Sequence, residues 1–188
     1  ILPSSCSIYG FQEEGVIADE NSLTNPLTTY AKANFAAEND VLKLADKNFT
    51  VTVLRQATVY GYSPRMRFDL AINGMTYGAW KTGKLPLMRD GTQWRPMVHV
   101  SDTAKAQMYM LTADSNKVNG EIFNVGSDAN SYQLKDLSRG FSFKSKDKLN
   151  MNMGLSDLNL IEVINSITEK NLKLVIKVFG EEKEAGII

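Results

Sequence analysis

The chain has 188 residues, which suits one domain or most of one, and 43% of them are hydrophobic, enough to build a packed core. Lysine plus arginine and aspartate plus glutamate both number 21, so the balanced charge gives no electrostatic case for nucleic acid or an anionic membrane as a partner. A single cysteine, Cys6, excludes an internal disulfide, and with only one histidine in the chain we expect no metal site. No apolar run approaches the roughly 20 residues of a membrane span, and the N-terminus lacks a basic signal region, so we expect a cytoplasmic protein.

The first 60 residues have the pattern of a strand–helix–strand unit. Asn25-Pro26 predicts a helix start, because asparagine can cap a helix and proline favours its first position. Two predicted strands end at Ser5 and near Thr58, and ligands bind at the carboxyl ends of parallel strands, so one crevice is expected there. The expected elements are a strand to Ser5, a turn at Tyr9-Gly10, a helix from Asn25-Pro26 to about Asp46, and a buried β-branched strand over 50–55.

The middle of the chain continues this alternation. Its pattern predicts a helix over 64–82 beginning at Pro64, strands over 85–88, 97–100 and 121–125, a helix over 101–112 capped by Ser101 or Asp102, and a helix beginning at Tyr132.

The last 48 residues have a different character. Residues 141–150 are rich in lysine, 157–169 have the spacing of an amphipathic helix, and 172–178 alternate as in a strand. The stretch Asn152 to Asp157 echoes Asn124 to Asp128, which leaves open a duplication or a joined segment of a related gene.

The motif Ser4-Ser5-Cys6-Ser7-Ile8-Tyr9-Gly10, followed by Tyr30, carries a family resemblance. It resembles the extended short-chain dehydrogenase/reductase family, the NAD-dependent sugar-nucleotide epimerases and dehydratases, over roughly residues 1–137. There a strand ends in Ser-Ser-x-x-Val-Tyr-Gly, and the next helix carries Tyr-x-x-x-Lys. The resemblance implies an α/β fold: the C-terminal part of a Rossmann-type parallel sheet plus a small α/β substrate-binding domain.

The resemblance also implies a division of the chain. We expect a remnant of the NAD-binding domain over 1–62, a substrate-binding domain over 63–140, and an atypical helix–strand segment over 141–188. No Gly-rich dinucleotide-binding loop precedes the serine motif, so the chain is interpreted as a fragment lacking the N-terminal dinucleotide-binding half.

The implied catalytic residues are Ser5, which would orient a sugar hydroxyl, and Tyr30, which would be the general acid or base. The family lysine four residues after the tyrosine is replaced by Asn34, which has no charge to favour the tyrosinate. Lys32 does not substitute for it, because residue i+2 points to another side of the helix. Asn34 can still hydrogen-bond a ribose hydroxyl.

Two later motifs extend the resemblance. Residues 54–61 resemble Leu-Arg-x-x-x-Val-Tyr-Gly, which packs against nicotinamide and substrate, and residues 90–102 resemble a family segment whose arginine binds the diphosphate of the sugar nucleotide. The implied cofactor-binding residues are Ser4, Tyr30, Asn34, Ala57 and Thr58. The implied substrate-binding residues are Ser5, Thr58, Arg67, Asn73 and Arg95.

Three polar residues on or beside predicted strands have structural interpretations. Arg55 lies on an otherwise apolar strand and is expected to be structural. His99 is expected to be a packed or hydrogen-bonded residue rather than a catalyst, and Asp102 to be a helix cap.

Two functions remain open from the sequence. The first is an NAD-dependent epimerase/dehydratase-like protein acting on a nucleotide-diphosphate sugar through transient oxidation, with a homodimer possible in a full-length parent. The alternative is a truncated, inactive remnant that at most binds a nucleotide sugar. NAD is implied by the resemblance, but without the Gly-rich loop we expect no tight NAD binding by this chain alone.

Overall fold

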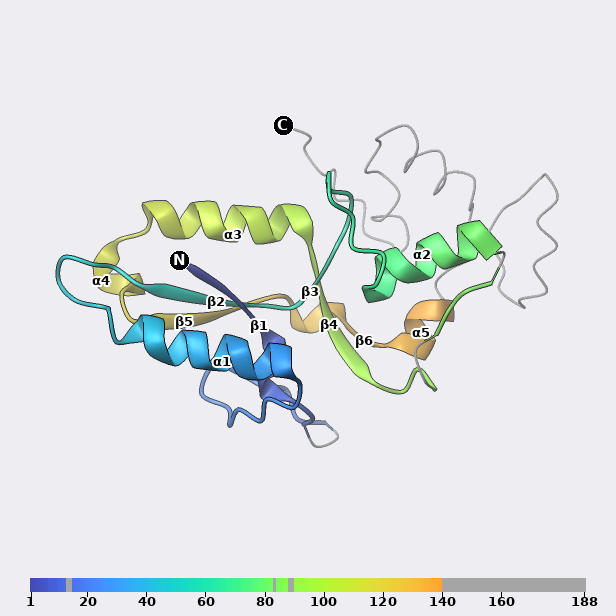
Figure 1. Ribbon diagram of the computed structural model, residues 1–188, viewed down its shortest axis with the longest axis horizontal. Helices are drawn as coiled ribbons and strands as arrows, with labels where there is room; N and C mark the ends of the chain where they lie inside the picture. The colour runs from blue at the N-terminus through green and yellow to red at the C-terminus, as the bar shows by residue number, and fades with distance from the viewer. Residues whose placement is uncertain (13–14, 83, 88–89, 140–188) are drawn as a thin grey trace. The chain divides into compact units, whose positions relative to one another are not determined.

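The computed structural model describes residues 1–12, 15–82, 84–87 and 90–139 (Figure 1), and the chain divides into two compact units. Of the described residues, the first unit contains those within 1–59 and 96–130, and the second contains those within 60–95 and 131–139. Because residues 96–130 return to the first unit, that unit is discontinuous. The functional division expected from the sequence, with boundaries after residues 62 and 140, stays a prediction. The helix and strand expected after residue 150 lie outside the described residues.

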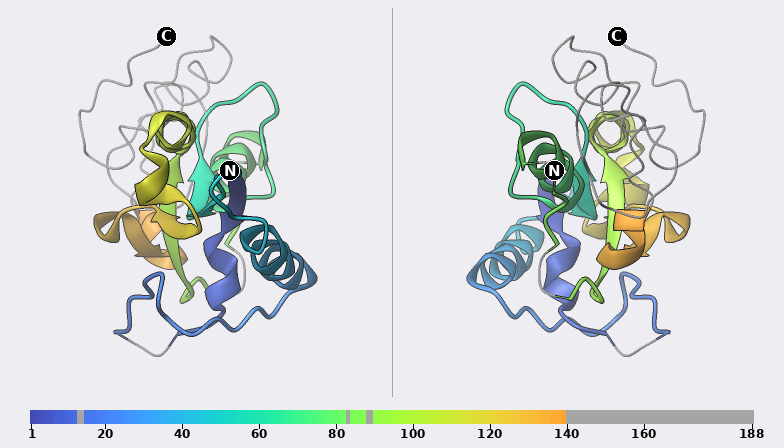
Figure 2. Two further views of the ribbon diagram at one scale, coloured as in Figure 1. Left: turned by 90° about the vertical axis from the view of Figure 1, so that its left-hand side faces the viewer. Right: turned by 90° about the vertical axis from the view of Figure 1, so that its right-hand side faces the viewer.

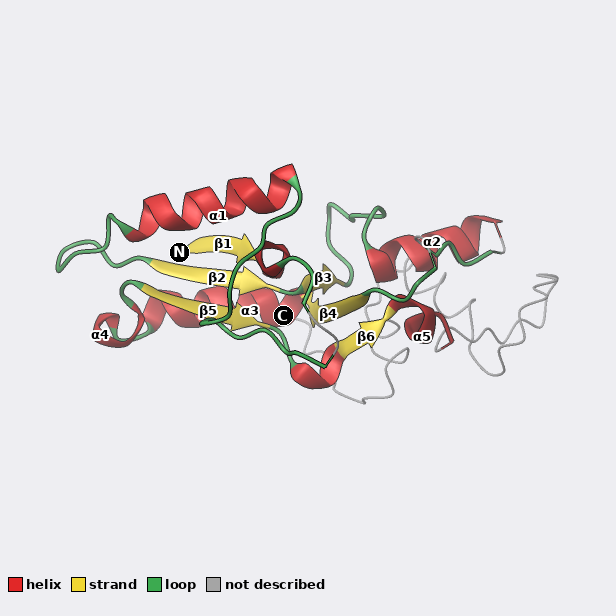
Figure 3. Cartoon of the chain, turned by 90° about the horizontal axis from the view of Figure 1, so that it is seen from below, coloured by secondary structure: helices red, strands yellow, loops and turns green. Residues whose placement is uncertain are grey.

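The core of the first unit is a parallel sheet with strand order β1-β2-β5, formed by β1 (Leu2–Ser5), β2 (Thr52–Gln56) and β5 (Glu121–Val125). Figure 3 shows the three strands side by side. Leu2 is paired with Val53, and Val53 with Ile122, so the strands run in step to a common carboxyl edge. The predicted strand–helix–strand unit with parallel neighbours is confirmed.

Helices cover both faces of this sheet. In Figures 1 and 2, α1 (Thr29–Leu42) and α3 (Val100–Thr112) lie on opposite sides of the strands. The first four residues of β2 are all buried, as expected of a central strand covered on both faces. The unit also contains the 3₁₀ helices η1 (Cys6–Tyr9) and η2 (Asp128–Asn130) and the short helix α4 (Ser115–Val118).

The helix starts differ from the sequence expectation. Helix α1 begins after Thr28, whose Oγ1 accepts a hydrogen bond from Ala31 N at 3.1 Å, so the start expected at Asn25-Pro26 is wrong. Helix α3 is capped by His99, whose Nδ1 accepts from Ser101 N at 3.2 Å, so the caps expected at Ser101 or Asp102 are also wrong. In both helices a side-chain acceptor next to the first turn satisfies a backbone N–H that has no partner inside the helix.

The described part of the second unit is built around α2 (Ala71–Thr82) and α5 (Leu134–Arg139). The helix expected from Pro64 therefore begins seven residues later, and residues 85–87 form no strand. Leu134 N and Lys135 N, at the start of α5, donate to the carbonyl oxygens of Gln93 and Gly91 at 3.3 and 2.8 Å. The described residues also form a second sheet with the order β3-β4-β6, made of β3 (Thr58–Tyr60), β4 (Trp94–His99) and β6 (Ser131–Gln133). Most of β3 and β4 belongs to the first unit.

Candidate functional site

Ser4 and Ser5 end β1, and strand alternation directs their side chains to opposite faces. Ser5 is half-buried and caps η1, with its Oγ accepting from Ser7 N at 3.2 Å. Ser4 is 4% exposed, and its hydroxyl donates to the Glu38 carboxylate of α1. Of the two serines, only Ser5 presents its oxygen outside the packed interior.

Tyr30 is the second residue of α1, and its side chain is 62% exposed. One turn later, Asn34 is half-buried, and its Nδ2 donates to the carbonyl oxygen of Tyr30 at 2.9 Å. The Asn34 amide is therefore held against the first turn of α1, whereas Lys32 is exposed. The tyrosine and the asparagine occupy the same strip of the helix, as their spacing predicts.

Ala57 and Thr58 follow the carboxyl end of β2. Ala57 is buried, and its N–H donates to the carbonyl oxygen of Val125, at the end of β5, at 2.9 Å. A Cβ at Gly126 would lie 3.1 Å from the Ala57 Cβ, so these two strand ends pack closely and leave room only for small residues. Thr58 is half-buried at the start of β3.

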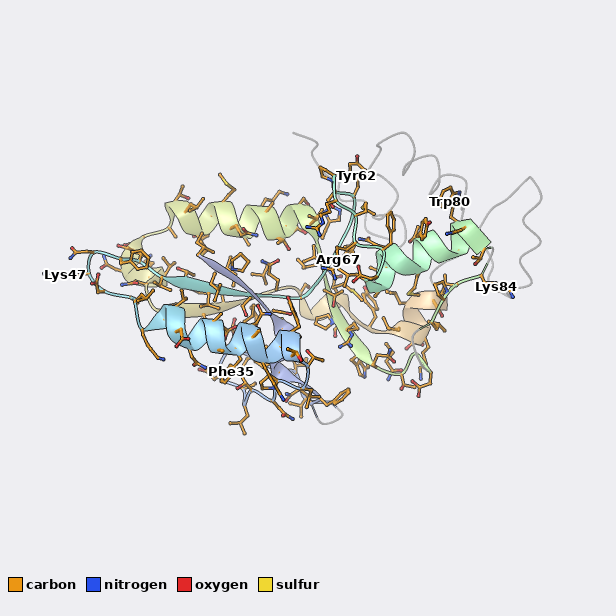
Figure 4. The ribbon with its side chains drawn as sticks, in the orientation of Figure 1. Phe35, Lys47, Tyr62, Arg67, Trp80 and Lys84 are labelled. Carbon is orange, nitrogen blue, oxygen red and sulfur yellow. The ribbon has the colours of Figure 1, made fainter. Side chains whose placement is uncertain are left out.

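In the second unit, two of the three predicted substrate residues have structural partners. Arg67, just ahead of α2 in Figure 4, forms an exposed ion pair with Asp69 at 2.6 Å, and its hydrogen bond lowers the pKa of Asp69 to about 2. Asn73 is buried in α2, and its Oδ1 accepts from Gly61 N at 3.2 Å. Arg95 is exposed on β4.

The largest feature that sequence reasoning missed is a buried polar cluster around Arg55. Arg55 and Glu38 form an ion pair at 2.8 Å between side chains that are 5% and 1% exposed. This confirms the structural interpretation of Arg55. Burial alone would lower the pKa of the guanidinium, but the hydrogen bonds to Glu38 and Tyr9 outweigh it and raise the pKa. A buried arginine on an apolar strand requires a buried acceptor. From the sequence, this requirement was the only indication that an acidic residue, here Glu38, would be buried beside Arg55.

Partial or full burial shifts the pKa values of two further groups near the strand ends. Burial raises the pKa of the Cys6 thiol to about 11, and its Sγ lies 3.3 Å from the carbonyl oxygen of Arg55. His99 is buried, its Nδ1 lies 2.7 Å from Ser101 Oγ, and burial lowers its pKa. Packing and hydrogen bonding of His99 are confirmed.

The described part of the chain contains no group of three or more histidine, cysteine, aspartate or glutamate residues that could hold a metal ion. Nor does it contain a helix with the length and apolar character needed to cross a bilayer.

Comparison with known proteins gives one result for the end of the chain. The model of the MraW methylase family matches residues 93–188, about half of which lie outside the described residues. Ribosomal RNA small subunit methyltransferase H of Thermotoga neapolitana is 35% identical over 79 residues, which cover 42% of this chain and 26% of that protein. This family differs from the one that matches the start of the chain.

The start of the chain gives a second result. The model of the NAD dependent epimerase/dehydratase family matches residues 1–126. An uncharacterized Schizosaccharomyces pombe protein is 31% identical over 147 residues, which cover 66% of this chain and 39% of that protein.

Solved structures agree with this match. The dTDP-glucose 4,6-dehydratase of Bacillus anthracis in complex with NAD has a TM-score of 0.63 at 25% identity, covering 73% of this chain and 43% of that one. UDP-glucuronic acid 4-epimerase of Bacillus cereus, with UDP-glucuronic acid and NAD, has a TM-score of 0.62 at 27% identity, covering 73% and 42%. MoeE5 with the same two ligands has a TM-score of 0.63 at 28% identity, covering 73% and 45%.

These neighbours are NAD-bound, and NAD is the cofactor that the family implies. This chain spans less than half of each of them. The fold expected from the sequence, an α/β protein of Rossmann type, is confirmed. The chain belongs to the NAD-dependent epimerase/dehydratase family through residues 1–126, and its residues 93–188 also match the MraW methylase family.

Proposed function

We propose that this chain carries the proton-transfer part of a nucleotide-sugar site. Tyr30 would exchange a proton with a sugar hydroxyl that Ser5 orients, while the sugar carbon is transiently oxidised. The observation that supports this most strongly is the exposure of both groups at the carboxyl edge of the parallel sheet: Ser5 is half-buried at the end of β1, and Tyr30 is 62% exposed on the helix that follows. Ligands of open α/β sheets bind at this edge.

NAD would accept and return the hydride when bound, and the residues available to hold it suit its uncharged parts. The hydrogen bond from Asn34 to Tyr30 uses the amide nitrogen, so the amide oxygen can accept from a ribose hydroxyl. Ala57 and Thr58 would pack beside the nicotinamide ring. Ser4 fits less well, because its hydroxyl already donates to Glu38 in the interior.

The missing lysine limits what Tyr30 can do. A lysine ammonium ~5 Å from a phenol oxygen favours the tyrosinate by roughly 3 kcal/mol at an effective dielectric constant of ~20. Asn34 supplies no such charge. This observation favours the second candidate function, an inactive remnant that binds a nucleotide sugar without turning it over.

Arg95 would bind the diphosphate of the nucleotide sugar. Its guanidinium is exposed, and a planar fork of N–H donors matches phosphate oxygens. Arg67 would have to exchange its ion pair with Asp69 for the ligand, and Asn73 would act by holding Gly61 in place. The cytoplasmic location and the homodimer in a full-length parent stay predictions.

Calorimetric titration of the 188-residue chain with UDP-glucuronic acid tests this proposal. We expect saturable binding, weakened about tenfold or more by Arg95→Ala, since a charge-assisted hydrogen bond contributes about 1.5–3 kcal/mol. Lys84→Ala is the matched control, because Lys84 is an exposed cation of the same unit (Figure 4). No binding at millimolar ligand, or equal effects of the two variants, would refute the proposal.

Absorbance at 340 nm separates the two candidate functions. With NAD and the sugar nucleotide present, transient NADH that is lost in Tyr30→Phe supports the enzyme. Binding of the sugar nucleotide without NADH supports the remnant.

A further inference from the structure

A row of polar side chains crosses the buried sheet of the first unit one residue before its carboxyl edge. Ser4 of β1 is paired with Arg55 of β2, which is paired with Asn124 of β5. Residues paired across parallel strands direct their side chains to the same face. The central strand of a fully covered parallel sheet is ordinarily apolar, so a charged residue in this row calls for an explanation.

Glu38 of α1 lies over the row and binds two of its members. Its carboxylate accepts from Arg55 Nε at 3.3 and 3.2 Å and from Arg55 Nη2 at 2.8 Å. The same carboxylate accepts from the hydroxyl of Ser4. One buried carboxylate thus joins α1 to both β1 and β2.

The other side of Arg55 holds the segment that follows β1. Arg55 Nη1 donates to Tyr9 Oη of η1 at 2.9 Å and to the carbonyl oxygen of Glu20 at 3.3 Å. Tyr9 Oη donates to Asn124 Oδ1 at 2.8 Å, and Asn124 N donates to Glu20 Oε1 at 2.6 Å. The guanidinium carbon also lies 5.1 Å from the centre of the Tyr9 ring.

We propose that Arg55 and Glu38 are positioning residues for the pair Ser5 and Tyr30. Arg55 holds η1, which begins immediately after Ser5, and Glu38 holds α1, which carries Tyr30. Glu38 lies eight residues beyond Tyr30, about 12 Å along the helix, and 30, 34 and 38 follow one strip of its surface. The catalytic consequence rests on the proposed function, whereas the positioning itself does not.

Hydrogen bonds and ion pairs fix the orientation of a helix more closely than apolar packing does. An apolar contact tolerates small rotations and slides of a helix, but a charged fork bound to a carboxylate fixes both. A hydroxyl that orients a sugar and a phenol that takes its proton must be held to within a fraction of an ångström. The buried pair of Arg55 and Glu38 therefore fixes α1 relative to β1. A shift of one element along the other would separate Tyr30 from Ser5.

Amide hydrogen exchange of the ligand-free chain tests the positioning. Glu38→Gln removes the charge at nearly constant shape, and Asp40→Asn is the matched control, an exposed acid on the same helix paired with Lys43. We expect Glu38→Gln to accelerate exchange at residues 5–10 and 30–34 by a factor at least about tenfold larger than at Val53 and Leu54. Asp40→Asn should leave exchange at all of these residues unchanged. Uniform acceleration across the unit, or none, would overturn the proposal.

A double variant covers the case in which Glu38→Gln does not fold. Glu38→Met with Arg55→Met leaves no unpaired buried charge, and such replacements are often neutral in stability. We expect it to fold and to keep slow exchange at Val53 and Leu54 but to lose protection at residues 5–10 and 30–34. Wild-type protection of those two segments in the double variant would show that the pair positions nothing.

Sugar-nucleotide affinity supplies a readout that a purely structural role would not move. We expect the effects of Glu38→Gln and Tyr30→Phe on the UDP-glucuronic acid affinity to be non-additive, and those of Glu38→Gln and Arg95→Ala to add. Additive effects with both partners would contradict the positioning role. If the wild-type chain binds no sugar nucleotide, the proposed function fails while the exchange experiment still decides the positioning.

Discussion

Replacing Arg55 by methionine should be among the most destabilising single changes in the first unit. The substitution removes the cation beside the Glu38 carboxylate, which is 1% exposed, and among the described residues leaves it the Ser4 hydroxyl as a hydrogen-bond donor. Breaking a buried ion pair from one side costs about 3–5 kcal/mol. The exposed pair of Lys43 and Asp40, with side chains 71% and 78% exposed, offers the control: Lys43→Met should cost about 0.5 kcal/mol or less.

Urea denaturation measures the difference. With a urea dependence of about 2 kcal/mol per molar, Arg55→Met should lower the unfolding midpoint by roughly 2 M and Lys43→Met by about 0.25 M or less. The double variant Glu38→Met with Arg55→Met should recover most of the loss, because no charge is then buried alone. If Arg55→Met shifts the unfolding midpoint no further than Lys43→Met does, the argument that the buried Glu38 carboxylate depends on Arg55 for its stability is refuted.

Three further predictions concern single groups. Gly10→Ala should lower the free energy of unfolding by at least about 2 kcal/mol in a thermal melt, because Gly10 has φ +67° and a Cβ there would overlap the Asn25 carbonyl. Gly15→Ala, at φ +82° but with open space around the Cβ, should lower it by about 1 kcal/mol. Equal losses in the two variants would contradict this reasoning. With a pKa of about 11, the Cys6 thiol should react with iodoacetamide at pH 8 roughly two hundredfold more slowly in the folded chain than in urea, and equal rates would show that it is not shielded. Since burial lowers the His99 pKa, the folded chain binds that proton less tightly than the unfolded chain, so the stability should fall as the pH drops below about 6.5. In urea melts at pH 7 and 5.5, His99→Asn should reduce this dependence of stability on pH. An unchanged dependence would contradict the prediction.

The sequence predicted the parallel sheet well because apolar and β-branched runs are local signals. The predicted strand ending at Ser5 and those predicted over 50–55 and 121–125 all correspond to strands of one sheet. Helix starts were harder, because several residues near each start could serve as caps. Thr28 rather than Asn25, and His99 rather than Asp102, supply the acceptor, and the choice depends on where the chain leaves the preceding turn or strand.

The sequence predicted candidate residues of the site but not the buried contacts that hold the elements carrying them. Ser5 and Tyr30 were identified from motif spacing, and both lie outside the packed interior. Glu38 was missed, because an acid in a helix with many exposed residues looks like a solvated one. Its burial depends on Arg55, 17 residues away in the chain, and no local pattern carries that pairing.

The most direct test of the account is a ¹H–¹⁵N NMR titration of the 188-residue chain with UDP-glucuronic acid. We predict saturable shifts at the amides of Ser5 and Tyr30, which Tyr30→Phe weakens, while amides at the opposite end of the sheet, such as Thr52, stay unchanged. Saturable shifts that leave Ser5 and Tyr30 unaffected, or no shifts at millimolar ligand, would contradict a sugar site formed by these two residues.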